Sequence, residues 1–543
     1  MKRRDHLKGL MLLPLAGSTL PLNSILASPL AGMDGNAVVT DPKTPKPNVF
    51  QAIGVEPIIN CRGTFTIIGG SLERAEVRAA MEAASKNFVQ YDELADGIGK
   101  RLAELTGAEW GMVSAGCAAG MKHITAACVT GGNPEKLIRI PDLTGFDKTE
   151  VIIPRHSRNT YDHAIRNVGV KVITVDTLEE LENAINPKTA MIYLMAFDIA
   201  SSEAISLEAV AKLAKPKNIP IMVDAAAEDL TIPCVHLQRG ATVVVYSGGK
   251  AICGPQCAGL VLGKKDILMS AWQASSPHHG PGRDNKVGRE EMMGMLAAVE
   301  AWISRDHPGE WKRWLTWLDT IAKRLSQVDG IKTAVQEPTD LSNRSPVLNI
   351  SWDPDKLNIT GDEVAEEVGR NKPRIALGSH SEEGTTSIQI TTGQMQPGQE
   401  TIVADRIYNL LSQKRSPRST AMTAPSSTVS GRWDVTVDFF SSQSQHTLIM
   451  EQDGNWIQGS HQGEFTTRDM VGTLEGDQIK LRSVDRHTAD SITFIFSGTV
   501  SSDAISGQIY MGEYRTAKFT AKRHSYHKSR QKITVPGGPP LAT

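Results

Sequence analysis

From residue 48 to residue 263 the chain alternates strand-like β-branched runs with amphipathic helices. One helix is expected to begin at Thr177, with Glu180 three residues later in a capping-box pattern, and another at Ser206. Near-continuous apolar strands separated by such helices indicate a mostly parallel sheet covered on both faces, an α/β fold whose ligands bind at the carboxyl ends of the strands. The strand-like runs lie at 150–155, 171–176, 190–196, 219–225, 242–247 and 259–263.

The chain has almost no net charge, with 58 Lys and Arg against 60 Asp and Glu in 543 residues. Such a chain lacks the basic field that drives binding to a phosphate backbone, so a nucleic-acid binder is disfavoured. No apolar run reaches the roughly 18 residues that suggest a membrane-spanning helix, and six cysteines are too few for a disulfide scaffold. We therefore expect a soluble globular protein with no transmembrane span.

Two neighbouring strands end in residues that can carry chemistry. The run that starts at residue 219 delivers Asp224, and the next run ends in Ser247 and leads into Lys250. Two glycines precede Lys250 and a Gly-Pro pair follows it, so the lysine is held on a short turn rather than on a surface helix. Taken alone, this lysine would be interpreted as a solvated loop charge.

A segment of small residues upstream is a candidate anion site. Ser114, Gly116, Cys117 and Ala118 follow a short apolar run and lead into a helix. Small residues at a helix start leave backbone N–H groups open to an anion, which the helix dipole also favours. A tight loop in a close-packed corner is the alternative for this segment alone.

An aspartate at one strand end, a Ser-x-x-Lys at the next and a Gly-Pro-x-x-x-Gly before a further strand resemble the fold-type-I pyridoxal-phosphate enzymes. The resemblance is strongest to the class V aminotransferase group and its selenocysteine-synthase-like branch, and covers residues 48–413. It implies a three-layer α/β sandwich of the aspartate aminotransferase type with a smaller α+β domain. It also implies that Lys250 binds the cofactor covalently, that Asp224 keeps the pyridine nitrogen protonated, that Ser247 contacts the phosphate and that residues 114–118 form the phosphate cup.

The same resemblance suggests further residues around the ring. A histidine lies over the pyridine ring in class V relatives, which makes His156, just past the strand-like run at 150–155, the stacking and proton-transfer candidate. His163 on the next helix is a competitor, and most lone histidines are structural. Ala226 points the same way as Asp224 on an extended strand and is expected under the flat ring, unless it only packs.

Three basic residues are candidates for the substrate. Arg283 and Lys286 match an Arg-x-x-Lys pair near the active site of the resembled branch, or of a neighbouring subunit, with a solvated cluster as the alternative. Arg374 stands at a strand start in the smaller domain, from which fold-type-I enzymes commonly take the substrate carboxylate with a bidentate arginine. A structural ion pair is the alternative for Arg374. No metal site is expected.

The remaining chain divides by composition. Trp311, Trp314 and Trp317 stand at helical spacing, and we expect them in the core rather than as a stacking platform. Short period-two runs after a Ser/Thr/Pro-rich stretch predict an antiparallel sandwich or small barrel that loosely resembles lipocalin-like barrels. The expected boundaries are 48–309 for the cofactor-binding domain, 310–413 for the small domain, 414–431 for a linker, 432–524 for the β domain and 525–543 for a disordered tail.

Residues 1–33 have the outline of an export signal. A basic head that contains Arg3 and Arg4 precedes an apolar stretch from Leu10 to Leu20 and then small residues. The paired arginines resemble a twin-arginine signal, although His6 stands where that signal has a hydrophobic residue. We therefore expect an enzyme exported to the periplasm or cell envelope, with a frayed basic terminus as the alternative.

These features predict a pyridoxal-phosphate enzyme that acts on a small-molecule amino substrate. The resembled branch includes ammonia-lyases acting on amino-sugar acids, so α,β-elimination of a hydroxy-amino acid or amino-sugar acid is the first expectation. Transamination, β-replacement, racemisation and aldol cleavage share its first steps and stay open, as does a non-catalytic binding protein of the envelope. The resemblance also implies a homodimer or higher homo-oligomer.

Overall fold

The computed structural model describes residues 48–196, 205–382, 384–417, 421–526, 532–535 and 537–539. The expected export signal at 1–33 and much of the expected tail lie outside these residues. Within them, no helix is both long enough and apolar enough to cross a membrane.

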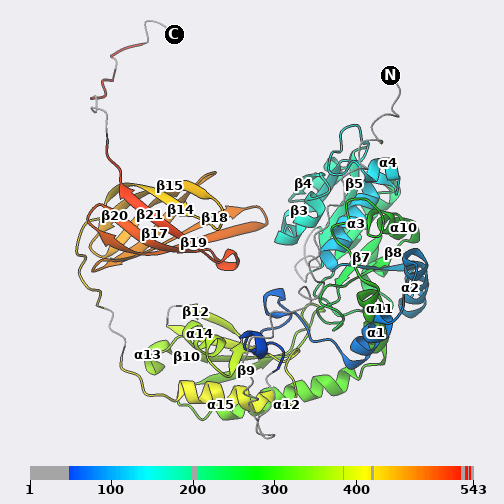
Figure 1. Cartoon of the computed structure of the whole chain (residues 1–543), viewed down its shortest axis with the longest axis horizontal. Coiled ribbons are helices and arrows are strands. Elements are labelled where there is room, and N and C mark those ends of the chain that lie inside the picture. Colours follow the sequence, from blue (N-terminus) through cyan, green and yellow to red (C-terminus); the bar gives the residue numbers. More distant parts are fainter. Residues whose placement is uncertain are drawn as a thin grey trace, which may run out of the picture. The chain divides into compact units, whose positions relative to one another are not determined.

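A seven-stranded sheet forms the centre of the first domain (Figure 1), in the order β2-β8-β7-β6-β5-β3-β4. All neighbouring pairs are parallel except the two that involve β8, so this one strand runs against the others. The strands are β2 (Trp110–Ser114), β3 (Glu150–Pro154), β4 (Lys171–Val175), β5 (Thr189–Met195), β6 (Ile221–Asp224), β7 (Val243–Ser247) and β8 (Gly259–Gly263).

The register of this sheet brings the predicted site residues to one edge. Ser114 at the end of β2 and Ser247 at the end of β7 both pair with Gly259, the first residue of β8. On β6, Asp224 pairs with Met195 on one side and with Val245 on the other. The carboxyl ends of β2, β5, β6 and β7 therefore meet at the same edge, where ligands of such sheets bind.

Helices cover both faces of the sheet, as predicted. Helix α3 (Cys117–Thr130) packs against α5 (His163–Arg166) and α10 (Lys265–Ala274) and contacts β5, β7 and β8. Helices α6 (Leu178–Ala184), α8 (Leu207–Ala214) and α9 (Val235–Arg239) contact one another in turn and lie on β3, β4 and β7. Helices α1 (Ala75–Ser85), α2 (Tyr91–Thr106) and α11 (Arg289–Ser304) pack beside β2 or on one another.

The predicted helix starts at Thr177 and Ser206 are present. The Thr177 side chain accepts from the N–H of Glu180, and the Ser206 side chain accepts from Ala209. The Glu180 carboxylate, however, accepts from the N–H of Asp176 rather than from that of Thr177. The capping box is therefore only half formed, because the chain before the helix brings the preceding N–H within reach.

The smaller domain has its own core, built on an antiparallel sheet in the order β12-β13-β10-β9. The long helix α12 (His307–Leu325) leads into it and places Trp317, Leu318 and Ile321 in that core. A short parallel pair joins β1 (Ile58–Asn60) to β11 (Arg374–Ala376). The other elements are β9 (Lys332–Gln336), β10 (Val347–Trp352), α13 (Pro354–Leu357), α14 (Gly361–Arg370), β12 (Gly378–Glu382), β13 (Thr385–Thr391) and α15 (Gln399–Leu411).

The β domain is a closed barrel of eight antiparallel strands (Figure 1). Each strand pairs with the next along the chain, and β14 pairs with β21 to close the ring, which decides for a barrel over a sandwich. Buried and exposed residues alternate along β14, and Trp433, Phe496 and Phe519 fill the interior. The strands are β14 (Gly431–Asp438), β15 (Gln443–Asp453), β16 (Trp456–Gln462), β17 (Thr467–Glu475), β18 (Gln478–His487), β19 (Asp490–Ser501), β20 (Ala504–Tyr510) and β21 (Thr516–Arg523).

Candidate active site

Asp224 is a buried carboxylate at the carboxyl end of β6, and three groups donate hydrogen bonds to it. The Tyr193 phenol donates to Oδ2 at 2.9 Å, the Ala226 N–H donates to Oδ1 at 3.0 Å, and the Cys117 thiol donates to Oδ1 at 3.5 Å. An ionised carboxylate can be buried only with such partners. The structure thus supplies a fixed acceptor at the strand end, where the sequence predicts the partner of the pyridine nitrogen.

Tyr193 was not identified from the sequence. It lies within β5, and the side-chain amide of Asn159 donates to its phenol oxygen at 2.9 Å. Burial and the nearby Asp224 carboxylate raise the pKa of Tyr193 well above its ordinary value. The phenol therefore stays protonated and donates a hydrogen bond to Asp224. Asn159, Tyr193 and Asp224 therefore form a chain of hydrogen bonds that ends at the candidate site.

Lys250 stands on a tight turn after β7. The Gly248 N–H donates to Ala258 O at 2.8 Å, and the Gly254 N–H donates to Gly248 O at 2.8 Å. A Cβ on Gly248 would lie 2.7 Å from Ala258 O, and one on Gly249 would lie 2.2 Å from the Gln256 side chain, so both glycines are needed. The turn predicted around Lys250 is present.

The sheet register brings the turn that carries Lys250 to the end of β6. Asp224 pairs with Val245 of β7, and Lys250 follows shortly after that strand ends at Ser247. Burial and the Asp224 carboxylate raise the pKa of Cys117, whereas the Lys250 ammonium acts on it in the opposite direction. The predicted lysine and aspartate therefore lie at the same edge of the sheet.

The start of α3 lies at the same edge. Gly116 has a φ of 89°, and no side chain caps the first turn of the helix. A Cβ on Gly259 would lie 2.5 Å from the carbonyl carbon of Gly116, so this strand start must be glycine. The buried Ser114 hydroxyl donates to Gly116 O at 2.9 Å and holds the loop. The Ser114 and Cys117 side chains therefore face the protein, and the uncapped backbone N–H groups that lead to the exposed Ala118 are open to an anion.

His156 lies in a short 3-10 turn, Arg155–Ser157, directly after β3. The Ser157 hydroxyl accepts from the N–H of Met195, whose register partner is Asp224, so the turn is tied to the edge that carries the site. The competitor His163 is 59% exposed. His156 therefore remains the histidine candidate.

The two arginines beside His156 have partners of their own. Arg155 forms a two-point ion pair with Asp176, and Arg158 pairs with the buried Asp162 and donates to Thr174. These contacts use the guanidinium donors that a phosphate or carboxylate would need.

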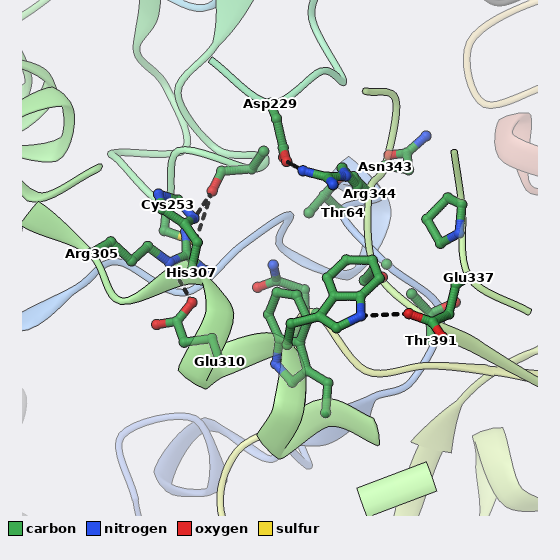
Figure 2. Close-up of a pocket in the computed structure, with 18 of the residues that line it drawn as sticks. Thr64, Asp229, Cys253, Arg305, His307, Glu310, Glu337, Asn343, Arg344 and Thr391 are labelled. Atoms are coloured by element: carbon green, nitrogen blue, oxygen red, sulfur yellow. Dashed lines mark hydrogen bonds and ion pairs between the residues drawn. The ribbon is translucent and has the colours of Figure 1, made fainter. Parts of the chain in front are cut away.

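A cavity of about 580 Å³ lies between the large and the small domain (Figure 2). Its wall contains Ala227, three residues after Asp224, and Ala251, the residue after Lys250. The Asn343 N–H donates to Ala227 O at 2.8 Å and fastens a small-domain loop to the loop after Asp224. The volume is in the range of small-molecule sites, and the cavity adjoins both loops that carry the predicted chemistry.

The substrate-binding candidates from the sequence do not line this cavity. Arg374 donates to Gly369 O at 2.7 Å within its own domain, Arg283 donates weakly to Ser276 Oγ at 3.3 Å, and Lys286 is exposed. Two other arginines, Arg305 and Arg344, line the cavity instead (Figure 2). Neither arginine has a local signal in the sequence, since both lie in loops whose position depends on the packing of the two domains.

The two cavity arginines differ in burial and in how closely they contact neighbouring carboxylates. Arg305 is nearly buried, pairs with Glu310 and donates to Ala251 O at 3.2 Å. Arg344 is 47% exposed, and its nearest carboxylate oxygen, on Asp229, is 3.6 Å away, beyond a strong hydrogen bond. Burial raises the pKa of Asp229, and Arg344 acts against that shift. Arg344 is thus the cavity arginine with donors available to a ligand.

Residues 92–304 match the family model described as "Cys/Met metabolism PLP-dependent enzyme". The D-glucosaminate-6-phosphate ammonia lyase of Salmonella typhimurium (strain 14028s / SGSC 2262) is 30% identical over 300 residues, which make up 54% of this chain and 79% of the relative. The chain belongs to this family of pyridoxal-phosphate-dependent enzymes. A solved structure of D-glucosaminate-6-phosphate ammonia-lyase matches with a TM-score of 0.60 and 25% identity, covering 68% of this chain and 99% of that one.

Two further relatives of this chain are named for other reactions. The 5'-C-glycyluridine monooxygenase-decarboxylase of Streptomyces sp is 26% identical over 60% of this chain and 83% of the relative. The L-seryl-tRNA(Sec) selenium transferase of Proteus mirabilis (strain HI4320) is 26% identical over 46% of this chain and 56% of the relative. The expected cofactor, enzyme class and aminotransferase-like fold are thereby confirmed.

The residues at the sheet edge fit pyridoxal phosphate. The uncapped first turn of α3 would supply N–H donors for its phosphate, the buried Asp224 an acceptor for its ring nitrogen, and Lys250 an amine for its aldehyde. Ser247 ends β7 opposite Gly259, next to the start of α3, where it would contact the phosphate. Ala226 does not continue the strand as expected: β6 ends at Asp224, and Ala226 lies in the turn that follows, where its N–H donates to Asp224 Oδ1.

Proposed function

We propose that this enzyme is an ammonia-lyase that acts on a 2-amino sugar acid by α,β-elimination. The observation that carries the proposal is the arrangement of the sheet edge: Asp224 ends β6 as a buried carboxylate, and the turns that follow β6 and β7, the second of which carries Lys250, adjoin a cavity large enough for a sugar acid. Likeness to an enzyme named for D-glucosaminate 6-phosphate supports the same substrate class.

In this proposal each residue has a defined task. Bound pyridoxal phosphate supplies an electron sink for charge that develops at the amino-bearing carbon. Asp224 Oδ would hold the proton on the ring nitrogen, and His156, in the turn after β3, would be the histidine that contacts the ring. Lys250 Nζ removes the proton from Cα and returns it to the departing β-hydroxyl, which leaves as water. The released enamine takes up water and yields the keto acid and ammonia.

Arg344 is the residue that we assign to the substrate carboxylate. Its guanidinium opens on the cavity, and the loose contact to Asp229 can be exchanged for a bidentate pair with a ligand (Figure 2). Arg374 does not line the cavity, and its Nε donates to Gly369 O within its own domain. This assignment replaces the expectation drawn from the sequence as the working hypothesis for substrate binding.

Two measurements test the proposed reaction. The purified enzyme should be yellow, and borohydride should trap the cofactor on Lys250 in the wild type but not in Lys250→Ala. With D-glucosaminate or its 6-phosphate, keto acid and ammonia should form in equal amounts without an added keto acid. A requirement for an added keto acid would instead favour an aminotransferase, and loss of optical activity without ammonia would favour a racemase.

We also propose that residues 1–33 direct export and that the mature enzyme works in the periplasm or cell envelope as a homodimer or larger homo-oligomer. The paired Arg3 and Arg4 before an apolar stretch support export. An Arg3→Lys/Arg4→Lys variant should remain in the cytoplasm of a host whose wild-type protein is found in the periplasmic fraction. Light scattering of the mature chain should give at least twice its monomer mass, and a monomer mass with full activity would refute the oligomer.

A further inference from the structure

The interdomain cavity offers a neutral lining, although three cations and three carboxylates stand around it. Arg305 is paired with Glu310, and Arg344 stands 3.6 Å from Asp229. The remaining pair consists of Lys312, which is exposed, and Glu337, whose carboxylate accepts from the Trp311 indole at 2.7 Å. A phosphate dianion is bound by an excess of positive charge, and the described residues that line this cavity have as many carboxylates as cations.

The start of helix α12 lines the same cavity, and the backbone N–H groups of its first turn already have hydrogen-bond acceptors. The His307 N–H donates to Arg305 O, Pro308 has no N–H, and the N–H groups of Gly309 and Glu310 donate to the Asp306 side chain and carbonyl. Asp306 and Glu310 also place negative charge at this helix terminus. The contrast with α3, whose first turn has no side-chain cap, is sharp: one helix start can receive a phosphate, and the other cannot.

Two tryptophans of α12 give the cavity an aromatic wall. Trp317, predicted in the core, is buried there, and Trp314 packs against the same core. Trp311, expected in the core with them, is instead partly exposed and lines the cavity, with its ring 6.0 Å from that of Trp314. The bond to Glu337 fixes the Trp311 indole, and an aromatic surface of this kind packs well on the C–H groups of a sugar chain.

Neutral polar groups complete the wall. The side chains of Thr64, Asn343, Ser345, Thr391 and Gln394 line the cavity, and hydroxyls and amides of this kind pair with hydroxyl groups without a charge mismatch. They lie on segments from both domains. The cavity therefore has hydrogen-bonding groups on several sides of an aromatic surface.

We propose that this cavity holds the hydroxylated chain of an unphosphorylated amino-sugar acid, with the chain lying along Trp311. The proposal rests on the proposed function and narrows its substrate: the carboxyl end lies toward Arg344 and the cofactor, and the distal end carries a free hydroxyl. In this respect the enzyme differs from the relative named for a 6-phosphate.

Binding of an unreactive analogue separates this inference from the proposed reaction. D-gluconate and 6-phosphogluconate have the acid and the hydroxylated chain but no amino group, so the holoenzyme binds them without turnover. Isothermal titration should give a Kd for D-gluconate equal to or smaller than that for 6-phosphogluconate. Trp311→Ala should raise the gluconate Kd at least tenfold and Trp311→Phe less than threefold. Trp456→Ala, on the barrel and 64% exposed, is the matched control and should leave it unchanged.

Tenfold tighter binding of 6-phosphogluconate, lost in Lys312→Gln, would overturn the inference in favour of a phosphate site. Failure of D-gluconate to bind while D-glucosaminate 6-phosphate is turned over would overturn it as well and would leave the ammonia-lyase intact. If gluconate binds through Trp311 but neither amino-sugar acid releases ammonia, the proposed reaction fails instead. In turnover assays the inference requires kcat/KM for D-glucosaminate to exceed that for its 6-phosphate at least tenfold.

Discussion

The Tyr193 phenol donates a 2.9 Å hydrogen bond to the Asp224 carboxylate from the neighbouring parallel strand. Asn159 donates to the same phenol oxygen, so the phenol proton is directed at Asp224. Because both residues are buried, this bond fixes the carboxylate in an orientation that solvent does not randomise. The acceptor for the cofactor nitrogen is therefore set in place before any ligand binds.

Removing this bond should slow catalysis more than it weakens substrate binding. Hydrogen bonds to charged groups are worth about 1.5–3 kcal/mol, so we expect Tyr193→Phe to lower kcat about 10-fold to 100-fold with little change in KM. Tyr246→Phe is the matched control, since Tyr246 is equally buried on β7 but its hydroxyl contacts Cys234. Equal losses of kcat in the two variants would show that Tyr193 acts only through packing.

The packing of β8 against the start of α3 gives a second prediction. In Gly259→Ala the new Cβ would lie 2.5 Å from the Gly116 carbonyl carbon, so the helix start must move. Overpacking of this kind costs about 1–3 kcal/mol, and we expect a lower Tm together with at least tenfold weaker binding of pyridoxal phosphate. Gly97→Ala, in an open position on α2, should instead keep cofactor affinity and raise stability by up to about 1 kcal/mol. Unchanged cofactor affinity in Gly259→Ala would contradict the assignment of the phosphate site.

Local signals were enough to predict Lys250 and Asp224. Asp224 is the last residue of a buried strand, and Lys250 stands in the turn after the next strand, and charged residues at such points are visible in the sequence. Tyr193 offers no such signal, because it stands inside an apolar run and acquires its partner only through the register of β5 with β6. The eight-strand barrel was predictable as a class from period-two runs, whereas its closure depends on the pairing of β14 with β21.

The substrate side was harder to predict for a related reason. Trp311, Trp314 and Trp317 share one helical spacing, but the cavity lies against only one side of α12, so the first faces it and the last is buried. Arg344 stands in a loop that backbone contacts, such as the one between Asn343 and Ala227, hold to the segment after Asp224. Contacts between two domains leave no periodic trace in a sequence.

Substitution of the two candidate carboxylate arginines should separate them. We expect Arg344→Gln to raise KM for the amino-sugar acid about 10-fold to 100-fold, since a charge-assisted pair is lost, with a smaller change in kcat. Arg374→Gln should change KM less than threefold, because Arg374 lies away from the cavity and bonds to Gly369. Steady-state kinetics of the two variants measure these changes in KM. A large rise of KM in Arg374→Gln and a small one in Arg344→Gln would instead assign the substrate carboxylate to Arg374.

A histidine pair inside the barrel should make that domain sensitive to acid. His446 Nδ1 and His461 Nε2 share a 2.8 Å hydrogen bond, and His461 Nδ1 bonds to the Ser483 hydroxyl. Burial, with the nearby His446 and Arg468, lowers the pKa of His461 from 6.5 to about 3, while Asp485 acts in the opposite direction. The folded barrel thus resists protonation that the unfolded chain accepts.

The sign of the effect follows from proton binding. Between pH 6.5 and 3 the unfolded state binds more protons at this site than the folded state, so stability is present at neutral pH and is lost as the pH falls through this window. For His461 alone the loss from pH 7 to pH 5 is about 2 kcal/mol. We expect hydrogen exchange in β15 and β16, corrected for intrinsic rates, to show this loss in the wild type and a smaller pH dependence in His461→Gln. His380→Gln, 63% exposed in the small domain, should keep the wild-type dependence, and an unchanged slope in His461→Gln would refute the role of the pair.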